Sequence, residues 1–392
     1  MKTLTDNTKL VLSTLEWNGH TAFLAGGAVR DMLMGVEPKD FDVATSALPE
    51  DVMSLFRGKG HKVLETGLQH GTVVVVMDNG EPFEVTTFRV DVETDGRHAE
   101  VEFVTDSKLD ASRRDLTFNS MFMNVDGDVV DHFGGREDLK NRVTRFVGNA
   151  DERLKEDFLR VLRFFRFSGR MGSVSTDETT LNALRDNAAG LEQVSGERVW
   201  MEMAKVLVGN ANVEVLESMN DLDVLRHTGL PEWFNVEALR GLTVDNPVTM
   251  LAAGLAGRKD ADERANAVEA VVARWKLSNP EKALLRFLTD DMNLGWTDDM
   301  VSDCEDMLDM FKMMSFQTNK DHVVELCRMT RCNEVVDELV AWEVPKLPVS
   351  GQDLLDRGMK QGREMGAVLE DMTTLWMSSM FTMTSNELLD TL

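Results

Sequence analysis

The chain has 392 residues, of which 42 are Lys or Arg and 68 are Asp or Glu, so its formal net charge at pH 7 is −26. A hydrophobic content of 43% with 28% charged residues is ordinary for folded proteins and excludes a globally disordered chain. The acidity argues against a protein that coats nucleic acid, because nonspecific binding requires a basic surface.

The cysteines and the apolar segments indicate a compartment. Cys304, Cys327 and Cys332 have no CxxC spacing, which argues against a disulfide scaffold and a Cys-rich zinc site and favours a reducing environment. The N-terminus has no long apolar h-region, and no run of about 18 uncharged apolar residues occurs. We therefore expect a cytoplasmic protein with no membrane partner.

The first 140 residues have a mixed pattern of short β-rich runs, turn signals and helical segments. The predicted strands cover residues 21–25, 41–44, 72–77, 81–89 and 99–104, and the predicted helices cover 29–33 and 50–56. From about residue 150 a 3.6-residue periodicity dominates. It predicts helices over residues 154–167, 178–187, 198–208 and 213–219. The expected fold class is α+β, with a mixed-sheet head followed by an all-helical remainder.

The first motif with chemical content is FLAGGAVRD at residues 23–31, where a predicted strand leads into a helix. Paired glycines allow a backbone to approach a ligand closely, and a helix N-terminus offers free N–H groups to anionic oxygens. Arg30 falls one turn into the helix, where a guanidinium can clamp a phosphate. An ordinary tight turn is the alternative for this motif alone.

The second motif is KDFDV at residues 39–43. Residues i and i+2 of a strand project to the same face, so Asp40 and Asp42 aim two carboxylates at one point. Such a pair suits a divalent cation, and Mg²⁺ binds through one or two carboxylates plus substrate phosphates. Glu84 from a neighbouring strand is a possible third carboxylate, although a solvent-facing Glu fits equally well, so it stays outside the predicted site.

The third motif is SRRDLTFN at residues 112–119. Paired arginines at 113 and 114 can neutralise a triphosphate, and we expect Asp115 to orient them. The motif alone is a weak signal.

The fourth motif is EDFLRVLRFFRF at residues 156–167. A spacing of three residues places Asp157, Arg160, Arg163 and Arg166 along one ridge of a continuous helix. An ordinary surface Asp–Arg pair, worth a few tenths of a kcal/mol, is the plain interpretation. Three arginines on one ridge repel one another, however, which favours an anionic partner.

Together these motifs resemble, in order and spacing, the class II nucleotidyltransferases: the bacterial-type CCA-adding enzymes, which are tRNA nucleotidyltransferases, and the bacterial poly(A) polymerases. The resemblance covers residues 20–170 closely, including DHFGGREDL at 131–139, and resumes in GERVW at 196–200. The segment LPVSGQDL at 347–354 is similar to the tail of CCA-adding enzymes rather than of poly(A) polymerases.

The resemblance implies a nucleotidyltransferase head at residues 1–140, followed by an elongated helical part. That part would comprise a neck with a base-reading helix at 141–205, a body at 206–305 and a tail at 306–392. The head would contain the catalytic centre, and the helical part would hold the acceptor arm of tRNA. DNA is not an expected partner.

The resemblance also implies a mechanism in which Asp40 and Asp42 are catalytic and hold two Mg²⁺ ions. The 3′-hydroxyl of tRNA would attack the α-phosphate of CTP or ATP, and pyrophosphate would leave. The positions that match nucleotide-binding residues of the family are Gly27, Arg30, Arg114, Asp157, Arg160, Arg163 and Arg166. Among these, Asp157 and Arg160 match the pair that acts as a protein template for the incoming base.

The chemistry of that template agrees with the expected substrates. Cytosine and adenine both present an exocyclic amino donor beside a ring-nitrogen acceptor. A carboxylate and a guanidinium therefore complement both bases, whereas uracil and guanine present a carbonyl and an N–H at those places. Asp157 and Arg160 would thus select CTP and ATP without a nucleic-acid template.

Other functions remain open from the sequence alone. A poly(A) polymerase or an enzyme adding only A would use the same head, but the tail and the length of residues 89–111 favour addition of all three nucleotides. A catalytically inactive RNA-binding module would gain nothing from the paired aspartates. A small-molecule nucleotidyltransferase would not need the long helical extension.

The charge distribution refines the first inference from acidity. Residues 1–172 carry a net −7 and residues 173–392 carry −19, while residues 136–170 hold ten basic and six acidic side chains, a local +4. The acidity therefore does not exclude RNA. It predicts that RNA contact is confined to a basic track, with a shallow dependence of affinity on salt.

Overall fold

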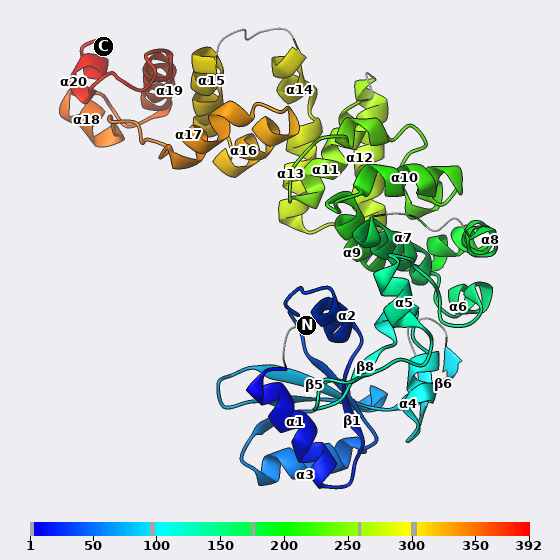
Figure 1. Cartoon of the computed structure of the whole chain (residues 1–392). Helices are drawn as coiled ribbons and strands as arrows, with labels where there is room; N and C mark the ends of the chain where they lie inside the picture. Colours follow the sequence, from blue (N-terminus) through cyan, green and yellow to red (C-terminus); the bar gives the residue numbers. More distant parts are fainter. Residues whose placement is uncertain (1–3, 95–98, 173, 175–176, 258–259, 299–303) are drawn as a thin grey trace. The chain divides into compact units, whose positions relative to one another are not determined.

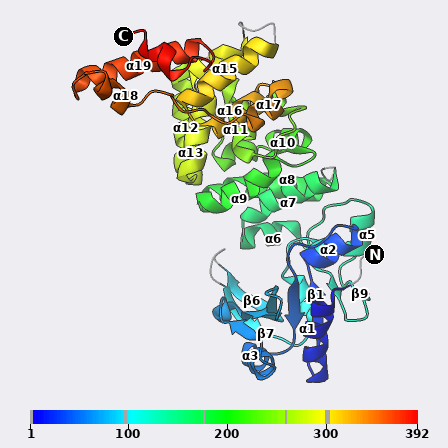
Figure 2. The ribbon, with the colours of Figure 1, turned by 90° about the vertical axis from the view of Figure 1, so that its left-hand side faces the viewer.

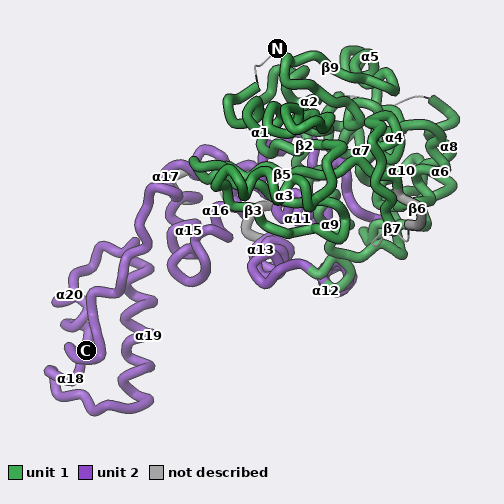
Figure 3. Tube along the Cα trace, turned by 90° about the horizontal axis from the view of Figure 1, so that it is seen from below, with its two compact units in different colours: residues 1–232, 273–276 green, residues 233–272, 277–392 purple. Residues whose placement is uncertain are grey.

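The computed structural model describes residues 4–392 apart from 95–98, 173, 175–176, 258–259 and 299–303 (Figure 1). It confirms the α+β class, with a mixed sheet near the N-terminus and helices through the rest of the described chain. The chain divides into two compact units, coloured separately in Figure 3. The first unit comprises residues 1–232 and 273–276, and the second comprises 233–272 and 277–392. The finer division into head, neck, body and tail stays a prediction.

A seven-stranded sheet forms the base of the first unit, with the strand order β3-β4-β5-β2-β1-β8-β9. Its strands are β1 (Ala22–Ala25), β2 (Asp42–Thr45), β3 (Lys62–Leu64), β4 (Thr72–Val76), β5 (Pro82–Thr87), β8 (Phe122–Met123) and β9 (Val129–Val130). All neighbouring pairs are antiparallel except β2 and β5, which run parallel. A separate antiparallel pair consists of β6 (Arg89–Thr94) and β7 (Ala99–Phe103).

Helices pack on this sheet through apolar side chains. The helices of this region are α1 (Asp6–Trp17), α2 (Gly27–Leu33), α3 (Pro49–Gly58), α4 (Ser107–Ser112) and α5 (Gly135–Lys140). Helix α3 begins at Pro49, whose fixed φ suits the first helical turn, and buries Val52 and Phe56. Helix α1 contacts β1 and α3, and α3 contacts β3, β4 and β5. Helices α1 and α3 therefore pack together against the seven-stranded sheet.

A group of helices completes the first unit (Figure 2). They are α6 (Ala150–Glu156), α7 (Leu159–Met171), α8 (Glu178–Asn187), α9 (Gly196–Leu207) and α10 (Asn212–Asp221). Helix α7 packs along α9, and α6 packs along α8. The indole rings of Trp200 and Trp275 stack with centroids 5.2 Å apart, which fixes residues 273–276 against α9.

The described part of the second unit is helical. Its helices are α11 (Pro247–Ala256), α12 (Ala261–Trp275), α13 (Asn279–Thr289), α14 (Asp291–Asp298), α15 (Cys304–Gln317), α16 (Lys320–Met329), α17 (Val336–Ala341), α18 (Gly351–Asp356), α19 (Arg363–Ser378) and α20 (Ser385–Leu389). Of these, α12 ends in residues of the first unit. No helix among the described residues is long and apolar enough to span a bilayer.

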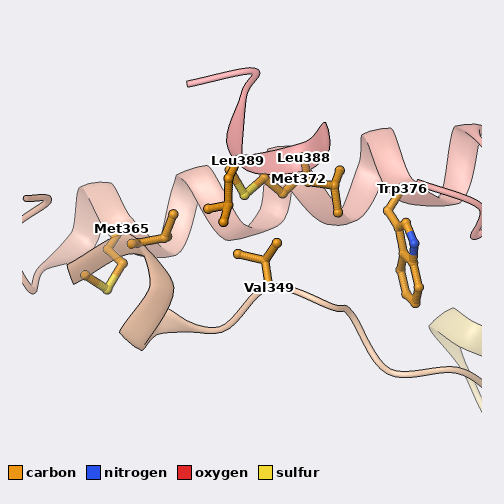
Figure 4. Packing of buried hydrophobic residues seen from close by; sticks show 7 residues of the cluster. Val349, Met365, Met372, Trp376, Leu388 and Leu389 are labelled. Carbon is orange, nitrogen blue, oxygen red and sulfur yellow. The ribbon is translucent and has the colours of Figure 1, made fainter. Parts of the chain in front are cut away.

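The last three helices share an apolar core, shown in Figure 4. Its buried side chains are Val349, Leu354, Met365, Met372, Trp376, Leu388 and Leu389. The indole N–H of Trp376 donates to the carbonyl oxygen of Met383 at 3.1 Å, so the polar end of this large side chain is satisfied. Two of these helices begin with a capping box, with Ser350 as the N-cap residue of α18 and Thr384 as that of α20.

Candidate active site

The turn between β1 and α2 requires glycine. Gly26 has a φ of 63°, and a Cβ atom there would lie 2.8 Å from Nη1 of Arg114. Both the backbone conformation and the close approach exclude a larger residue. Helix α2 then begins at Gly27, and Arg30 lies one turn later with its side chain buried. The turn therefore brings the backbone of the GG motif against an arginine of the SRRD motif.

Two carboxylates meet where β2 and β5 run side by side. Asp42 is the first residue of β2 and pairs in register with Glu84 of β5. Asp40 lies in a bend before the strand rather than on it, so the expected i, i+2 strand geometry is wrong for this pair. Burial raises the pKa of Asp42, Glu84 and Asp40 raise it further, and Arg114 opposes them. Glu84, which the sequence left undecided, is thus a close neighbour of Asp42.

This donor set fits a hard divalent cation. Oxygen ligands are what Mg²⁺ prefers, and it typically takes one or two carboxylates and completes its shell with water and phosphate. Among the described residues, no group of three or more His, Cys, Asp or Glu side chains is arranged to hold a metal on its own. A cation at Asp42 and Glu84 would therefore depend on the substrate for part of its coordination.

A cavity of about 560 Å³ joins these elements in the first unit. Seven of the nine residues expected in the site line it, namely Gly27, Arg30, Asp42, Arg114, Asp157, Arg160 and Arg163. Asp40 and Arg166 are outside this lining, and Glu84, Asp115 and Arg198 are within it. The structure thus gathers residues from all four motifs around one space.

Asp110 of α4 orients the paired arginines, which corrects the role expected for Asp115. Its carboxylate lies 2.8 Å from Nη2 of Arg113 and 3.0 Å from Nη2 of Arg114. Burial opposes ionisation of Asp110, but Arg114 and Arg113 outweigh it and lower its pKa. The i, i+3 and i, i+4 spacing on and just after α4 makes this contact possible. Arg114 is therefore held in place before any ligand binds.

Asp115 instead points to the helix of the fourth motif. Its Oδ2 accepts from Arg163 at 2.6 Å, and its Oδ1 accepts from the backbone N–H of Leu116 at 2.9 Å. Burial alone would raise the pKa of Asp115, but the charge and hydrogen bond of Arg163 lower it. Asp115 thus links the third motif to the fourth.

The fourth motif is not one continuous helix, contrary to the predicted helix over residues 154–167. Helix α6 ends at Glu156, and Asp157 has an extended backbone with φ −156° and ψ 106° before α7 begins at Leu159. The Asp157 carboxylate accepts from the backbone N–H of Leu159 at 3.1 Å and lies 2.7 Å from Nη2 of Arg198. The break turns this carboxylate into the cavity instead of along a helix ridge.

The arginines of α7 each have a carboxylate partner. Nη1 of Arg160 lies 2.5 Å from Oε2 of Glu156, and Nε of Arg166 lies 3.1 Å from Oε2 of Glu202. Arg163 contacts Asp115, as described above. Their mutual repulsion therefore gives no support of its own to the expected anionic partner, because carboxylates of the protein already compensate these charges. What remains for a ligand is the donor capacity that these pairs leave unused.

Known proteins are similar to this chain over most of its length. Residues 22–145 match the family described as Poly A polymerase head domain, and residues 175–234 match the one described as Probable RNA and SrmB- binding site of polymerase A. The chain is 43% identical over 384 residues to CCA tRNA nucleotidyltransferase 1, mitochondrial, of Danio rerio, covering 94% of this chain and 86% of that protein. The chain belongs to the CCA-adding enzyme family of tRNA nucleotidyltransferases.

Other CCA-adding enzymes are similar to this chain over more than nine tenths of its length. A CCA-adding enzyme of Leuconostoc mesenteroides is 32% identical over 373 residues, covering 92% of this chain and 89% of that protein. The crystal structure of the Bacillus stearothermophilus CCA-adding enzyme in complex with CTP superposes with a TM-score of 0.74 at 27% identity, covering 97% of this chain and 94% of that one. These matches confirm the family expected from the motifs.

Three residues that contribute to this site are absent from the set that the sequence predicts, and one of them, Glu84, was left undecided. Glu84 depends on the parallel pairing of β2 with β5, which are far apart in sequence order. Arg198 belongs to the GERVW segment, and nothing in that segment predicts its contact with Asp157. Asp110 precedes the arginines by one helical turn, and this spacing was the signal that could have found it.

Proposed function

We propose that this chain adds CCA to the 3′ end of tRNA, using CTP and ATP and no nucleic-acid template. The observation that carries the proposal is the cavity that Asp42 and Glu84 line together with Arg114, Asp157 and Arg160. Asp42 and Glu84 are carboxylates suited to nucleotidyl transfer, and Asp157 and Arg160 are a carboxylate and a guanidinium suited to reading a base. The near full-length similarity to CCA tRNA nucleotidyltransferases supports the same assignment.

The base-reading pair has free hydrogen-bonding capacity. Each carboxylate oxygen of Asp157 accepts one hydrogen bond within the protein, which leaves lone pairs for the exocyclic amine of cytosine or adenine. Arg160 uses Nη1 for Glu156 and for the carbonyl of Arg153, and Nη2 for the carbonyl of Arg113. Its Nε proton and one Nη2 proton stay available for the ring nitrogen.

Arg198 prepares Asp157 for this task. Its guanidinium contacts one oxygen of Asp157 from α9, while the backbone N–H of Leu159 contacts the other. These two contacts fix the direction of the carboxylate. A base that presents a carbonyl in place of the amine would meet two acceptors facing each other.

The reaction forms a bond between the 3′-oxygen of the RNA and the α-phosphorus and breaks the bond to the β-phosphate, so pyrophosphate leaves. Asp40 and Asp42, with Glu84 beside Asp42, would hold Mg²⁺, which when bound neutralises phosphate charge and acidifies the attacking hydroxyl. Arg114, fixed by Asp110, would bind the triphosphate, and Arg30 and Gly27 would contact the nucleotide from the β1–α2 turn.

Incubating the protein with tRNA that lacks CCA, in the presence of single nucleoside triphosphates, tests this proposal. We expect CTP incorporation on this acceptor, and ATP incorporation only on a second acceptor that already ends in the two cytidines. Extension by ATP alone, repeated many times, would instead indicate a poly(A) polymerase. No incorporation of either nucleotide would support an inactive RNA-binding module.

The acceptor arm of tRNA is the expected partner of the helical part, as the sequence predicts. The location stays a prediction: the sequence suggests the cytoplasm, whereas the Danio rerio relative and one of Homo sapiens, 38% identical over 400 residues, are both named mitochondrial.

A further inference from the structure

A second cavity of about 390 Å³ lies in the first unit, and the reaction described above does not use it. Four cationic side chains line it: Arg30, Arg166, Arg170 and Lys205. We refer to it as the basic cavity. It shares Arg30 and the ring of Phe167 with the active-site cavity, so the two spaces are neighbours.

The cations of the basic cavity outnumber the carboxylates that contact them. Asp31 lies 2.8 Å from Arg30 and 2.8 Å from Arg170, so one carboxylate serves two guanidinium groups. Glu202 lies 3.1 Å from Arg166. Four positive groups thus face two negative ones, and the cavity keeps a surplus of positive charge in a protein whose net charge is −26.

Lys205 is the cation with no carboxylate partner. Glu202 precedes it by one turn of α9, the spacing of a helical ion pair, but its carboxylate faces Arg166. Among the described residues no ion pair engages the Lys205 ammonium, and the side chain is exposed at the cavity. Its charge is therefore available to an anion.

The basic cavity is separate from the metal-binding carboxylates. No residue of the seven-stranded sheet lines it, whereas Asp42 and Glu84 line the active-site cavity. A triphosphate bound at those carboxylates would occupy the active-site cavity, so the basic cavity suits a phosphate from another molecule. A phosphate held by Arg30 and Lys205 would lie next to the nucleotide.

We propose that the basic cavity binds a backbone phosphate of the RNA substrate. This inference rests on the proposed function, since it assigns a contact to the same RNA acceptor. A phosphodiester there would position the RNA without reading its sequence. Each such contact releases condensed counterions, which makes it measurable through the salt dependence of affinity.

The substitution Lys205→Gln tests the proposal with little risk to folding, because the side chain is exposed and its replacement removes no ion pair. Lys205→Arg keeps the charge. Lys59→Gln is the matched control, an exposed lysine that follows α3 and lines neither cavity. The measurements are the dissociation constant of tRNA lacking CCA at several salt concentrations, and the KM for CTP.

We expect Lys205→Gln to lower the log–log salt slope by about 0.7 to 0.9, the contribution of one phosphate contact, with an unchanged KM for CTP. Lys205→Arg and Lys59→Gln should keep the wild-type slope. An unchanged slope in Lys205→Gln would overturn the proposal.

Two further readouts identify a wrong ligand. Weaker inhibition by inorganic pyrophosphate with an unchanged RNA slope would assign the basic cavity to free phosphate and overturn the RNA contact. A raised KM for CTP with an unchanged salt slope would assign the basic cavity to the nucleotide. That result would also overturn the proposed RNA contact. If the wild-type protein bound tRNA but incorporated no nucleotide, the proposed function would fail, and the slope would still test the cavity.

Discussion

At the scale of single residues, the proposed function makes base selection depend on the two carboxylate oxygens of Asp157. Asp157 was found from sequence by its motif, but its environment was not, because an extended residue between two helices leaves the 3.6-residue pattern of its neighbours intact. Leu154, Val161 and Leu162 are all buried, as one continuous helix would also require. The sequence therefore identified the residue, and only the backbone shows why its carboxylate reaches the cavity.

The substitution Asp157→Ala should relax the discrimination against UTP. The substitution removes the carboxylate of Asp157, which accepts a hydrogen bond from the exocyclic amine of cytosine or adenine. The same carboxylate repels the carbonyl of uracil. Incorporation of CTP and UTP on tRNA lacking CCA, compared as kcat/KM ratios, measures this effect. Asp151→Ala, at an exposed ion pair with Lys155 on α6, is the control and should keep the wild-type ratio. An unchanged preference in Asp157→Ala would show that the base is read elsewhere.

At the scale of elements, the ring of Phe167 connects helices α2 and α7. The ring centroid of Phe167 lies 4.9 Å from the guanidinium carbon of Arg30, 5.7 Å from that of Arg163 and 4.3 Å from that of Arg166. The ring is buried and packs edge-on against Phe118. Guanidinium groups over an aromatic face are attracted to it, so this ring places arginines from two helices around a common point.

The substitution Phe167→Leu keeps an apolar side chain but removes the aromatic face. If substrate binding loses the equivalent of one cation–π contact, about 0.5–1 kcal/mol, we expect the KM for CTP and ATP to rise by roughly 2- to 5-fold while the protein stays folded. Steady-state kinetics measures the change. Phe164→Leu is the control, because its ring packs against Phe146 and Phe165 instead. A similar rise in KM in both variants would indicate a general packing defect.

Close packing requires a glycine, Gly196, at the start of α9. A methyl group at Gly196 would overlap the carbonyl oxygen of Arg274, so α9 can approach residues 273–276 only without a side chain there. We expect Gly196→Ala to lower the free energy of unfolding by about 1–3 kcal/mol, as overpacking does. Urea denaturation measures this loss. Gly58→Ala, in α3 with nothing within 4 Å of the added methyl, should be neutral or slightly stabilising, and an equal loss in both variants would contradict this role of Gly196.

Elements were predicted better than the contacts between them. The predicted helix over residues 178–187 coincides with α8 (Glu178–Asn187), and the predicted strand over 72–77 is β4 to within one residue. Local periodicity determines such segments. The partnership of Asp42 with Glu84 was left undecided because it depends on the order of strands in the sheet, which a single sequence does not reveal.

At the scale of the whole molecule, the sign of the net charge does not predict whether the protein binds RNA. A net charge of −26 argued against RNA, yet the cavity that carries the proposed chemistry is lined by several arginines. Most of these arginines are paired with carboxylates inside the protein. The positive charge available to RNA is therefore small and local.

This distribution predicts a shallow dependence of tRNA affinity on salt. Few basic groups are free to displace counterions, so the log–log slope of the binding constant against salt concentration should be well below the value for ten phosphate contacts, about −7 to −9. Equilibrium binding at several salt concentrations measures the slope. A slope at or beyond that value would mean that RNA contacts many basic groups outside the two cavities, on the acidic helical part.

The proposed function requires one protein cavity, without a template, to select cytidine twice and adenosine once. Its most direct test is to give the protein tRNA lacking CCA with all four nucleoside triphosphates together, and to sequence the 3′ ends of the products. We expect the added sequence to be CCA and extension to stop there. Long runs of adenosine, or uridine and guanosine at the added positions, would contradict this selection.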